Sequence, residues 1–201
     1  MSALVHAAAL RADLQYISDW IAPDSRVLDL GCGDGALLAH LRDTKRCRGY
    51  GVEFADEQVA RCVENGVNVV QQDLDAGLRM FRDDMFDTVV LSQTLQAMHD
   101  AERILVEMTR VARQGVVSFP NFGYWKHAVS LLGGRMPVTP DIPFQWYDTP
   151  NIHLCTLKDF EILAARVGLR VTDRVLLARG QPVGWAPSLR ATLALYRFER
   201  R

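Results

Sequence analysis

The segment from Val27 to Gly35 constrains the fold more than any other part of the chain. It reads Val-Leu-Asp-Leu-Gly-Cys-Gly-Asp-Gly, so a run typical of a buried strand leads directly into three glycines at alternate positions. A helical pattern with an apolar face follows from Ala36 to Arg42. Glycines here let the backbone turn sharply and approach a ligand closely, and the helix turns its free N–H groups toward the same place. A tight turn that merely needs glycine is the alternative interpretation.

Strand and helix patterns alternate on both sides of this loop. The sequence predicts further helices at 8–21, 57–64, 76–81, 101–113 and 157–167, and strands at 50–54, 67–72, 86–91, 116–119, 169–177 and 192–198. Such alternation is typical of an α/β fold with right-handed crossovers. We therefore expect a mainly parallel seven-stranded sheet with an antiparallel final strand and helices on both faces.

An insert at about 121–156 interrupts the alternation. Glycine and proline are frequent there, which resists regular structure apart from a helical turn at 126–132. Large aromatic rings with one polar edge suit either a substrate pocket or a surface for another protein, and a small packed subcore is the alternative of equal weight. The expected anchors of a partner surface are Tyr124, Trp125, Trp146 and Tyr147.

Composition narrows the classes of function. The chain has 201 residues, of which 49% are hydrophobic, so residues 1–201 suit a single domain. A net charge of −1 with scattered Lys and Arg argues against a nucleic-acid partner. Neither a membrane-spanning run of roughly 20 apolar residues nor a signal peptide is apparent, so we expect a cytoplasmic protein with no membrane partner. The cysteines form no C-x-x-C pair, which predicts reduced thiols and no metal site.

Acidic residues follow two further predicted strands at the edge that carries the glycine loop. Glu53 closes the second strand about twenty residues after the loop, where a carboxylate can accept both hydroxyls of a ribose. Asp73 follows the third strand and could accept from the exocyclic amine of an adenine. Each residue alone is ordinarily a solvated strand-end carboxylate. Together with the loop they mark the carboxyl edge of a parallel sheet, where such sheets bind ligands.

From Val27 to Asn121 the sequence resembles the class I S-adenosylmethionine-dependent methyltransferases, whose glycine loop has this G-x-G-x-G form and whose fold is Rossmann-like. The resemblance implies that S-adenosylmethionine or S-adenosylhomocysteine binds at this edge. The loop would then surround the methionine part, Glu53 would hold the ribose, and Asp73 would meet the adenine. The implied cofactor-binding residues are Asp29, Gly31, Cys32, Gly33, Gly35, Glu53, Phe54, Asp73, Leu74, Ser92 and Gln93.

The resemblance extends to one family, the methionine-biosynthesis MetW proteins. It rests on the glycine loop and on three further runs: Leu-Ser-Gln-Thr-Leu-Gln at 91–96, Phe-Pro-Asn-Phe-Gly-Tyr-Trp at 119–125, and Trp-Tyr-Asp-Thr-Pro-Asn-Ile-His at 146–153. It implies a role in methionine biosynthesis with homoserine O-acyltransferase as the suspected partner, which the protein would act with or regulate. Methyl transfer to a small-molecule acceptor is the alternative. Only the apolar start at 1–9 departs from the family pattern.

The residues available for acid–base chemistry do not point to one catalytic group. The candidates are His99, His127, Asp148 and His153. His99 follows the fourth strand near the expected site, but an ordinary surface histidine is the favoured interpretation because the sequence shows no partner for it. Methyl transfer from a sulfonium can be catalysed largely by positioning. The catalytic residue therefore stays unassigned.

Overall fold

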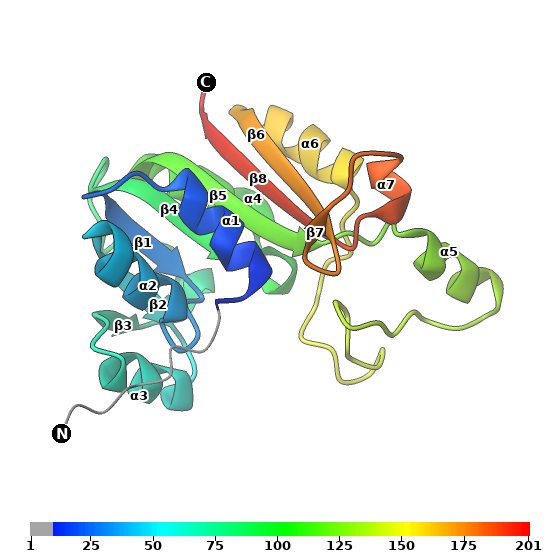
Figure 1. Cartoon of the computed structure of the whole chain (residues 1–201), viewed down its shortest axis with the longest axis horizontal. Coiled ribbons are helices and arrows are strands. Elements are labelled where there is room, and N and C mark those ends of the chain that lie inside the picture. Colours follow the sequence, from blue (N-terminus) through cyan, green and yellow to red (C-terminus); the bar gives the residue numbers. More distant parts are fainter. Residues whose placement is uncertain (1–9) are drawn as a thin grey trace.

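The computed structural model describes residues 10–201, and its central feature is one mixed sheet (Figure 1). The strand order is β3-β2-β1-β4-β5-β8-β6-β7. Strands β1 to β5 run parallel to one another, and β8 is antiparallel to both β5 and β6. The strands are β1 (Arg26–Leu30), β2 (Arg48–Glu53), β3 (Val69–Gln71), β4 (Phe86–Ser92), β5 (Ala112–Pro120), β6 (Leu169–Ala178), β7 (Gln181–Pro182) and β8 (Leu193–Arg200).

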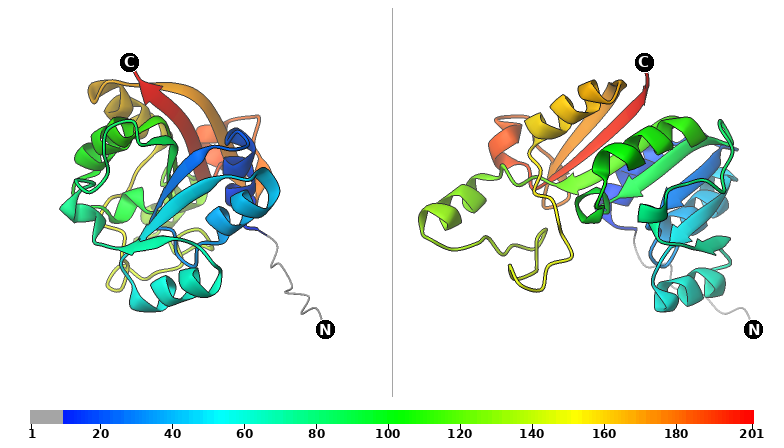
Figure 2. Two further views of the ribbon diagram at one scale, coloured as in Figure 1. Left: turned by 90° about the vertical axis from the view of Figure 1, so that its left-hand side faces the viewer. Right: turned by 180° about the vertical axis from the view of Figure 1, so that it is seen from behind.

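Helices cover both faces of the sheet. α1 and α2 lie on one face, and α4 and α6 lie on the other (Figures 1 and 2). None of the helices within residues 10–201 is long and apolar enough to cross a membrane. The helices are α1 (Ala12–Trp20), α2 (Ala36–Lys45), α3 (Asp56–Glu64), α4 (Ala101–Val111), α5 (Trp125–Leu132), α6 (Leu157–Arg166) and α7 (Pro187–Arg190).

Two hydrophobic clusters follow from the alternation of side chains along the central strands. In β4, Val89 and Leu91 pack into the cluster beneath α4 and α6, whereas Val90 packs into the cluster beneath α1 and α2. In β5, Val117 packs into the cluster beneath α4 and α6, and Val116 packs into the cluster beneath α1 and α2. Successive residues of a strand point to opposite faces, so a strand covered on both faces must be apolar throughout. The continuous apolar runs in the sequence therefore identify the middle of the sheet.

The predicted α/β architecture is confirmed, and three details differ. The sheet has an eighth strand, because the loop expected between the last two strands contains β7. The helix predicted at 76–81 is wrong: the chain forms a short 3₁₀ turn at Leu74–Ala76 and then an irregular loop. The predicted helix at 101–113 ends at Val111, because β5 begins at the next residue. The predicted start of the first helix at Ala8 lies outside the described residues.

Arg110 explains the missing helix at 76–81. Its Nη2 donates to the Leu78 carbonyl at 3.0 Å and its Nη1 donates to the Phe81 carbonyl at 2.9 Å. Leu78 and Phe81 are nonetheless buried in the core. The Arg110 guanidinium of α4 thus donates hydrogen bonds to carbonyl groups that would accept backbone N–H groups in a helix. Leu78 and Phe81 can therefore reach the core from a loop.

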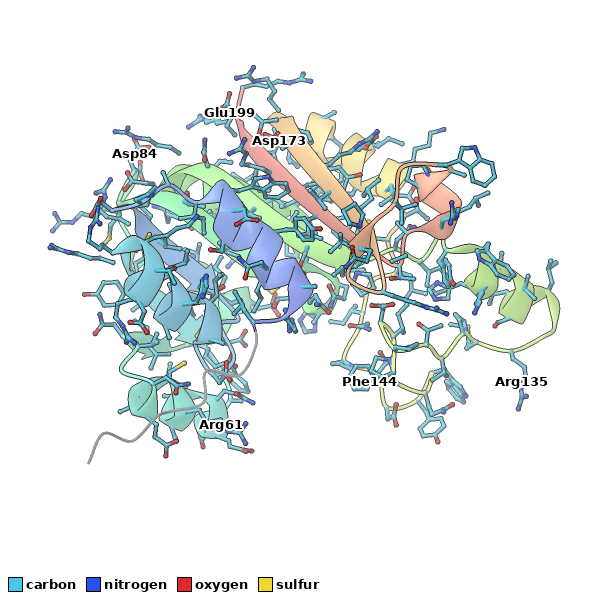
Figure 3. All side chains as sticks on the ribbon, in the orientation of Figure 1. Arg61, Asp84, Arg135, Phe144, Asp173 and Glu199 are labelled. Carbon is cyan, nitrogen blue, oxygen red and sulfur yellow. The ribbon has the colours of Figure 1, made fainter. Side chains whose placement is uncertain are left out.

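The insert projects away from the sheet, with α5 at its start and an extended return to α6 (Figures 1 and 2). Figure 3 places Arg135 and Phe144 on this projecting segment. Asn121 holds its base, because its buried Nδ2 donates to the carbonyls of Ala191 at 2.8 Å and Ser188 at 3.0 Å. The insert is therefore tied to α7 at its root, while most of its length extends into solvent.

We expect Gly49→Ala to destabilise the protein strongly, because a Cβ atom at this position in β2 would lie 2.0 Å from the Val27 carbonyl oxygen of β1. Backbone in the middle of a sheet cannot move aside easily, so the free energy of unfolding should fall by about 3 kcal/mol or more. Urea unfolding measures the change. Gly184→Ala is the control, because its Cβ would meet nothing within 4 Å. Equal stability of the two variants would contradict this packing.

Candidate functional site

The glycine loop between β1 and α2 is built by three residues in the left-handed region. Gly31, Gly33 and Gly35 have φ values of +68°, +56° and +77°. A Cβ at Gly31 would lie 2.6 Å from Thr94 Oγ1, and one at Gly35 would lie 3.0 Å from Val67 Cγ2. A Cβ at Gly33 would meet nothing within 4 Å. The outer two glycines therefore serve internal packing, and Gly33 borders space that a ligand can occupy.

Glu53 joins the end of β2 to this loop. Its Oε2 accepts the Gly33 N–H at 2.9 Å, and its Oε1 accepts the N–H groups of Phe54 at 2.8 Å and Ala55 at 3.1 Å. Three backbone donors thus orient one carboxylate beside the open side of Gly33. The structure brings together the loop and the acidic residue that the sequence predicted to act together.

Cys32 lies within the loop, but its side chain faces the core. Its Sγ is 3.6 Å from Cys62 Sγ of α3, and both thiols are buried. Cys62 Sγ also lies 3.1 Å from the Gly33 carbonyl oxygen, as a hydrogen-bond donor. Burial raises the pKa of both thiols, which disfavours the thiolate. Any contact of Cys32 with a ligand therefore comes from its backbone.

Asp29, the last polar residue of β1 before the loop, has an unusual environment. Its side chain is buried, and its carboxyl group accepts no hydrogen bond from the residues that the structure describes. Burial raises the pKa of Asp29 to about 7, the Arg11 guanidinium acts in the opposite direction, and Glu53 adds to the increase. The carboxylate form is thus poorly compensated, so a cation at this edge would stabilise it.

Ser92 and Gln93, at the end of β4, contact a residue that sequence reasoning missed. Gln93 Nε2 donates to Asp13 Oδ2 at 2.9 Å, and Ser92 Oγ lies 3.3 Å from the same oxygen. Arg11 donates to both Asp13 oxygens, at 2.9 and 2.8 Å. Burial acts to raise the pKa of Asp13, but the hydrogen bonds and charge of Arg11 outweigh it and lower the pKa. A sequence signal did exist, because Asp13 shares the buried face of α1 with Ile17, four residues on.

The predicted adenine side contains one exposed ring and one buried side chain. Asp73 Oδ1 accepts the Asp75 N–H at 2.9 Å and so caps the 3₁₀ turn. Leu74 is buried in the core, whereas Phe54 at the end of β2 is 70% exposed. Of the apolar residues predicted here, Phe54 is the one that presents a ring to solvent.

The four acid–base candidates do not form one cluster. His99 Nδ1 lies 2.6 Å from Asp75 Oδ2, a partner separated from it by 24 residues in sequence. His99 and His153 both line a cavity of about 400 Å³, whose apolar part includes Phe119 and Phe160. His127 is buried elsewhere, at the base of the insert, where burial lowers its pKa. Asp148 is exposed on the insert.

We expect Asp29→Asn to stabilise the ligand-free protein, increasingly so as the pH rises. A buried acid whose pKa is raised from 3.8 to about 7 costs stability progressively across that interval, because the folded state binds the proton more tightly. At pH 8, above both values, the variant should gain about 4 kcal/mol in free energy of unfolding, because each unit of pKa shift corresponds to about 1.4 kcal/mol. Urea unfolding from pH 5 to pH 8 tests this, with the exposed Asp19→Asn as control. Parallel pH curves for wild type and Asp29→Asn would refute it.

Solved structures with this fold include S-adenosylmethionine-dependent methyltransferases. A crystal structure of an S-adenosylmethionine-dependent methyltransferase from Mesorhizobium loti superposes with a TM-score of 0.71 at 18% identity, covering 94% of this chain and 98% of the other. At that identity the likeness shows the fold, which is the Rossmann-like class I methyltransferase fold. A phosphatidylethanolamine N-methyltransferase from Cereibacter sphaeroides is 34% identical over 47% of this chain and 48% of its own length.

A more extensive sequence match comes from Rhodopirellula baltica. Its bifunctional methionine biosynthesis protein MetXA/MetW is 37% identical over 95% of this chain, which covers 33% of that longer protein. The chain thus spans a third to about half of the length of these two relatives. The family model described as methionine biosynthesis protein MetW matches residues 11–198. The chain belongs to the MetW family.

Proposed function

We propose that the protein binds S-adenosylmethionine or S-adenosylhomocysteine and acts with, or regulates, a homoserine O-acyltransferase of methionine biosynthesis, in the cytoplasm. The observation that carries cofactor binding is the open space at Gly33, bordered by Glu53 in a methyltransferase fold. The name of the Rhodopirellula baltica relative supports the partnership, because it joins MetXA and MetW in one polypeptide. Joining two modules in one chain gives them a high effective concentration for each other.

The residues at the sheet edge fit such a cofactor. Asp29 offers a buried carboxyl group that lacks a hydrogen-bond donor in the described chain, and Glu53 offers an oriented carboxylate for ribose hydroxyls. Phe54 offers an exposed ring beside them. When bound, S-adenosylmethionine supplies a methyl group activated by a sulfonium. The chain contributes binding and orientation at this edge, through these side chains and the loop backbone.

The insert is suited to be the surface that binds the partner, although not all four expected anchor residues are well exposed. Trp146 is 72% exposed and Tyr147 is 71% exposed, and the two rings pack edge to face at 5.6 Å. Trp125 is about half exposed, whereas Tyr124 packs edge to face on the buried His127 at 5.4 Å. Exposed aromatic rings carry much of the binding energy at protein interfaces. We therefore propose Trp146 and Tyr147 as the principal anchors.

Methyl transfer to a small molecule is a second candidate function, favoured by the cavity that His99 and His153 line. Gln96 also lines this cavity, and its Nε2 donates to the Gln93 carbonyl at 2.6 Å, next to the predicted cofactor site. Asp75 orients the His99 ring, as a general base requires. The N-methyltransferase relative suggests amines as the first acceptors to test. Transfer of labelled methyl groups to small amines would establish this activity, and its absence with every amine would favour a binding role.

We expect Gly33→Ala to weaken binding of S-adenosylhomocysteine at least tenfold, because the Cβ would enter the space that the ligand needs. Isothermal titration calorimetry measures the affinity. Gly134→Ala is the matched control: Gly134 also has a positive φ, +72°, and its Cβ would also meet nothing within 4 Å. Both variants should lose about 1 kcal/mol of stability from backbone strain, but only Gly33→Ala should lose affinity. Unchanged affinity would mean that the cofactor does not approach this loop.

We expect Trp146→Ala to weaken association with the homoserine O-acyltransferase by about 2 kcal/mol or more, measured by co-purification and by titration of the two proteins. Trp185→Ala is the control, because Trp185 is 75% exposed but lies outside the insert. Affinity for S-adenosylhomocysteine should stay within a few fold in both variants. Equal association of both variants with the enzyme would exclude Trp146 as an anchor of the partner surface.

A further inference from the structure

A cavity of about 760 Å³ lies between the base of the insert and the hairpin formed by β6 and β7. Figure 1 shows α5, α7 and β7 at the same end of the molecule. Small-molecule sites have volumes of roughly 300–1,000 Å³, so the space is large enough for a ligand. The residues that line it are Tyr124, Trp125, Lys126, Val138, Thr139, Pro140, Asp141, Ala178, Arg179, Val183, Arg190 and Thr192. None of them belongs to the edge of the sheet that carries the glycine loop.

Three cations from different elements line this cavity. Lys126 comes from the first turn of α5, Arg179 from the turn between β6 and β7, and Arg190 from the end of α7. In the described part of the chain, no ion pair or side-chain hydrogen bond involves any of the three, whereas Arg174 of β6 pairs with Glu161. The fold thus gathers three charges that the protein itself does not neutralise.

The positive charge of the cavity wall is local. Asp141 is the one carboxylate among the lining residues, so three cations against one carboxylate leave an excess of two positive charges. The chain as a whole has a net charge of −1. Like charges around one cavity repel one another, and an anion between them removes that cost. Guanidinium and ammonium groups bind phosphate oxygens well, so the wall is suited to a ligand with at least two negative charges.

Arg179 occupies a position that its backbone conformation disfavours. Arg179 and Gly180 form the two-residue turn between β6 and β7, with φ values of +52° and +75°. Such hairpin turns favour Asn or Gly, because a positive φ strains residues with a Cβ atom. Turn preference therefore does not account for an arginine at this position, whereas a role for its side chain at the cavity wall does.

An exposed ring lies beside the charges. Trp125 is 46% exposed, and Lys126 Nζ lies 5.7 Å from the centroid of its ring. Across the cavity wall, the turn that carries Val138 is held by Thr139 and Ile142, whose backbones exchange hydrogen bonds at 2.9 and 3.0 Å. A nucleic-acid base of any kind can stack on an exposed aromatic ring. An inorganic anion alone would leave this ring in water, whereas a nucleotide would cover it.

We propose that this cavity binds a nucleotide with two or more phosphates, with the phosphates on Lys126, Arg179 and Arg190 and the base on the Trp125 ring. The inference does not depend on cofactor binding at the glycine loop, because the two places share no residue. An acidic segment of another protein is the competing occupant. The concave wall and the ring beside the charges favour the nucleotide.

ADP and inorganic pyrophosphate separate the two parts of the site by isothermal titration calorimetry. Arg179→Ala should weaken binding of both ligands about 5- to 20-fold, as expected for loss of an exposed charge-assisted contact, and Lys126→Ala and Arg190→Ala should act in the same direction. Trp125→Ala should weaken ADP by a similar factor but leave pyrophosphate within about twofold of wild type, because pyrophosphate has no base to stack.

Two control variants locate the binding. Arg135→Ala removes an exposed arginine of the insert that does not line the cavity, and it should change neither affinity (Figure 3). Gly33→Ala should leave ADP binding within about twofold, because the glycine loop is a separate place. Loss of ADP binding in Gly33→Ala would overturn the proposal, since ADP would then occupy the glycine-loop edge. An equal loss in Arg135→Ala and Arg179→Ala would also overturn it, because only diffuse charge would then matter.

The competing occupant has its own test. A hexaglutamate peptide should bind more weakly than ADP and should be displaced by it. Binding of the peptide by wild type, with no binding of ADP at about 1 mM, would overturn the proposal and identify the cavity as a surface for an acidic protein segment.

Discussion

The left-handed turn at Gly31, Gly33 and Gly35 is the constraint on which the rest of the site depends. It reverses the chain at the end of β1 and directs the Gly33 N–H at the Glu53 carboxylate. Because β2 and β4 flank β1 in the sheet, the same turn brings Glu53 from one side and Ser92 with Gln93 from the other. A side chain at any of the three positions would strain this arrangement. The order of the strands in the sheet, rather than any single residue, brings these side chains together.

The sequence predicted the parts of the molecule that local pattern determines. Apolar runs such as 27–30 mark buried strands, and the glycine spacing marks the turn, so the sheet and loop could be read directly. Contacts between side chains that are far apart in the sequence could not be predicted in this way. Asp75 pairs with His99 across 24 residues, and Arg11 reaches Ser92 across 81. The helix expected at 76–81 failed for the same reason, since a guanidinium from another helix takes up its carbonyls.

The insert and the sheet edge that carries the glycine loop are joined through Gln96. Its backbone carbonyl accepts the N–H groups of Ile152 at 2.8 Å and His153 at 2.9 Å, on the irregular segment by which the insert returns to α6. Its side chain donates to the Gln93 carbonyl, and Gln93 in turn binds Asp13. Hydrogen bonds thus connect the returning segment of the insert, at Ile152 and His153, with the charges around the glycine loop. These contacts form a continuous physical connection between the insert and the glycine loop. Any energetic coupling between the two is a separate quantity, and binding at either one would then affect binding at the other equally.

The position of β8 has a consequence for how the chain is made. β8 is the last strand in sequence, yet it lies between β5 and β6 and pairs with both. During synthesis from the N-terminus, β5 and β6 emerge earlier and must wait with unpaired edges until residues 193–200 leave the ribosome. Pairing of such distant segments closes long loops and slows folding. A nascent chain stalled before residue 193 would therefore expose the unpaired backbone edges of β5 and β6, which can pair with another chain.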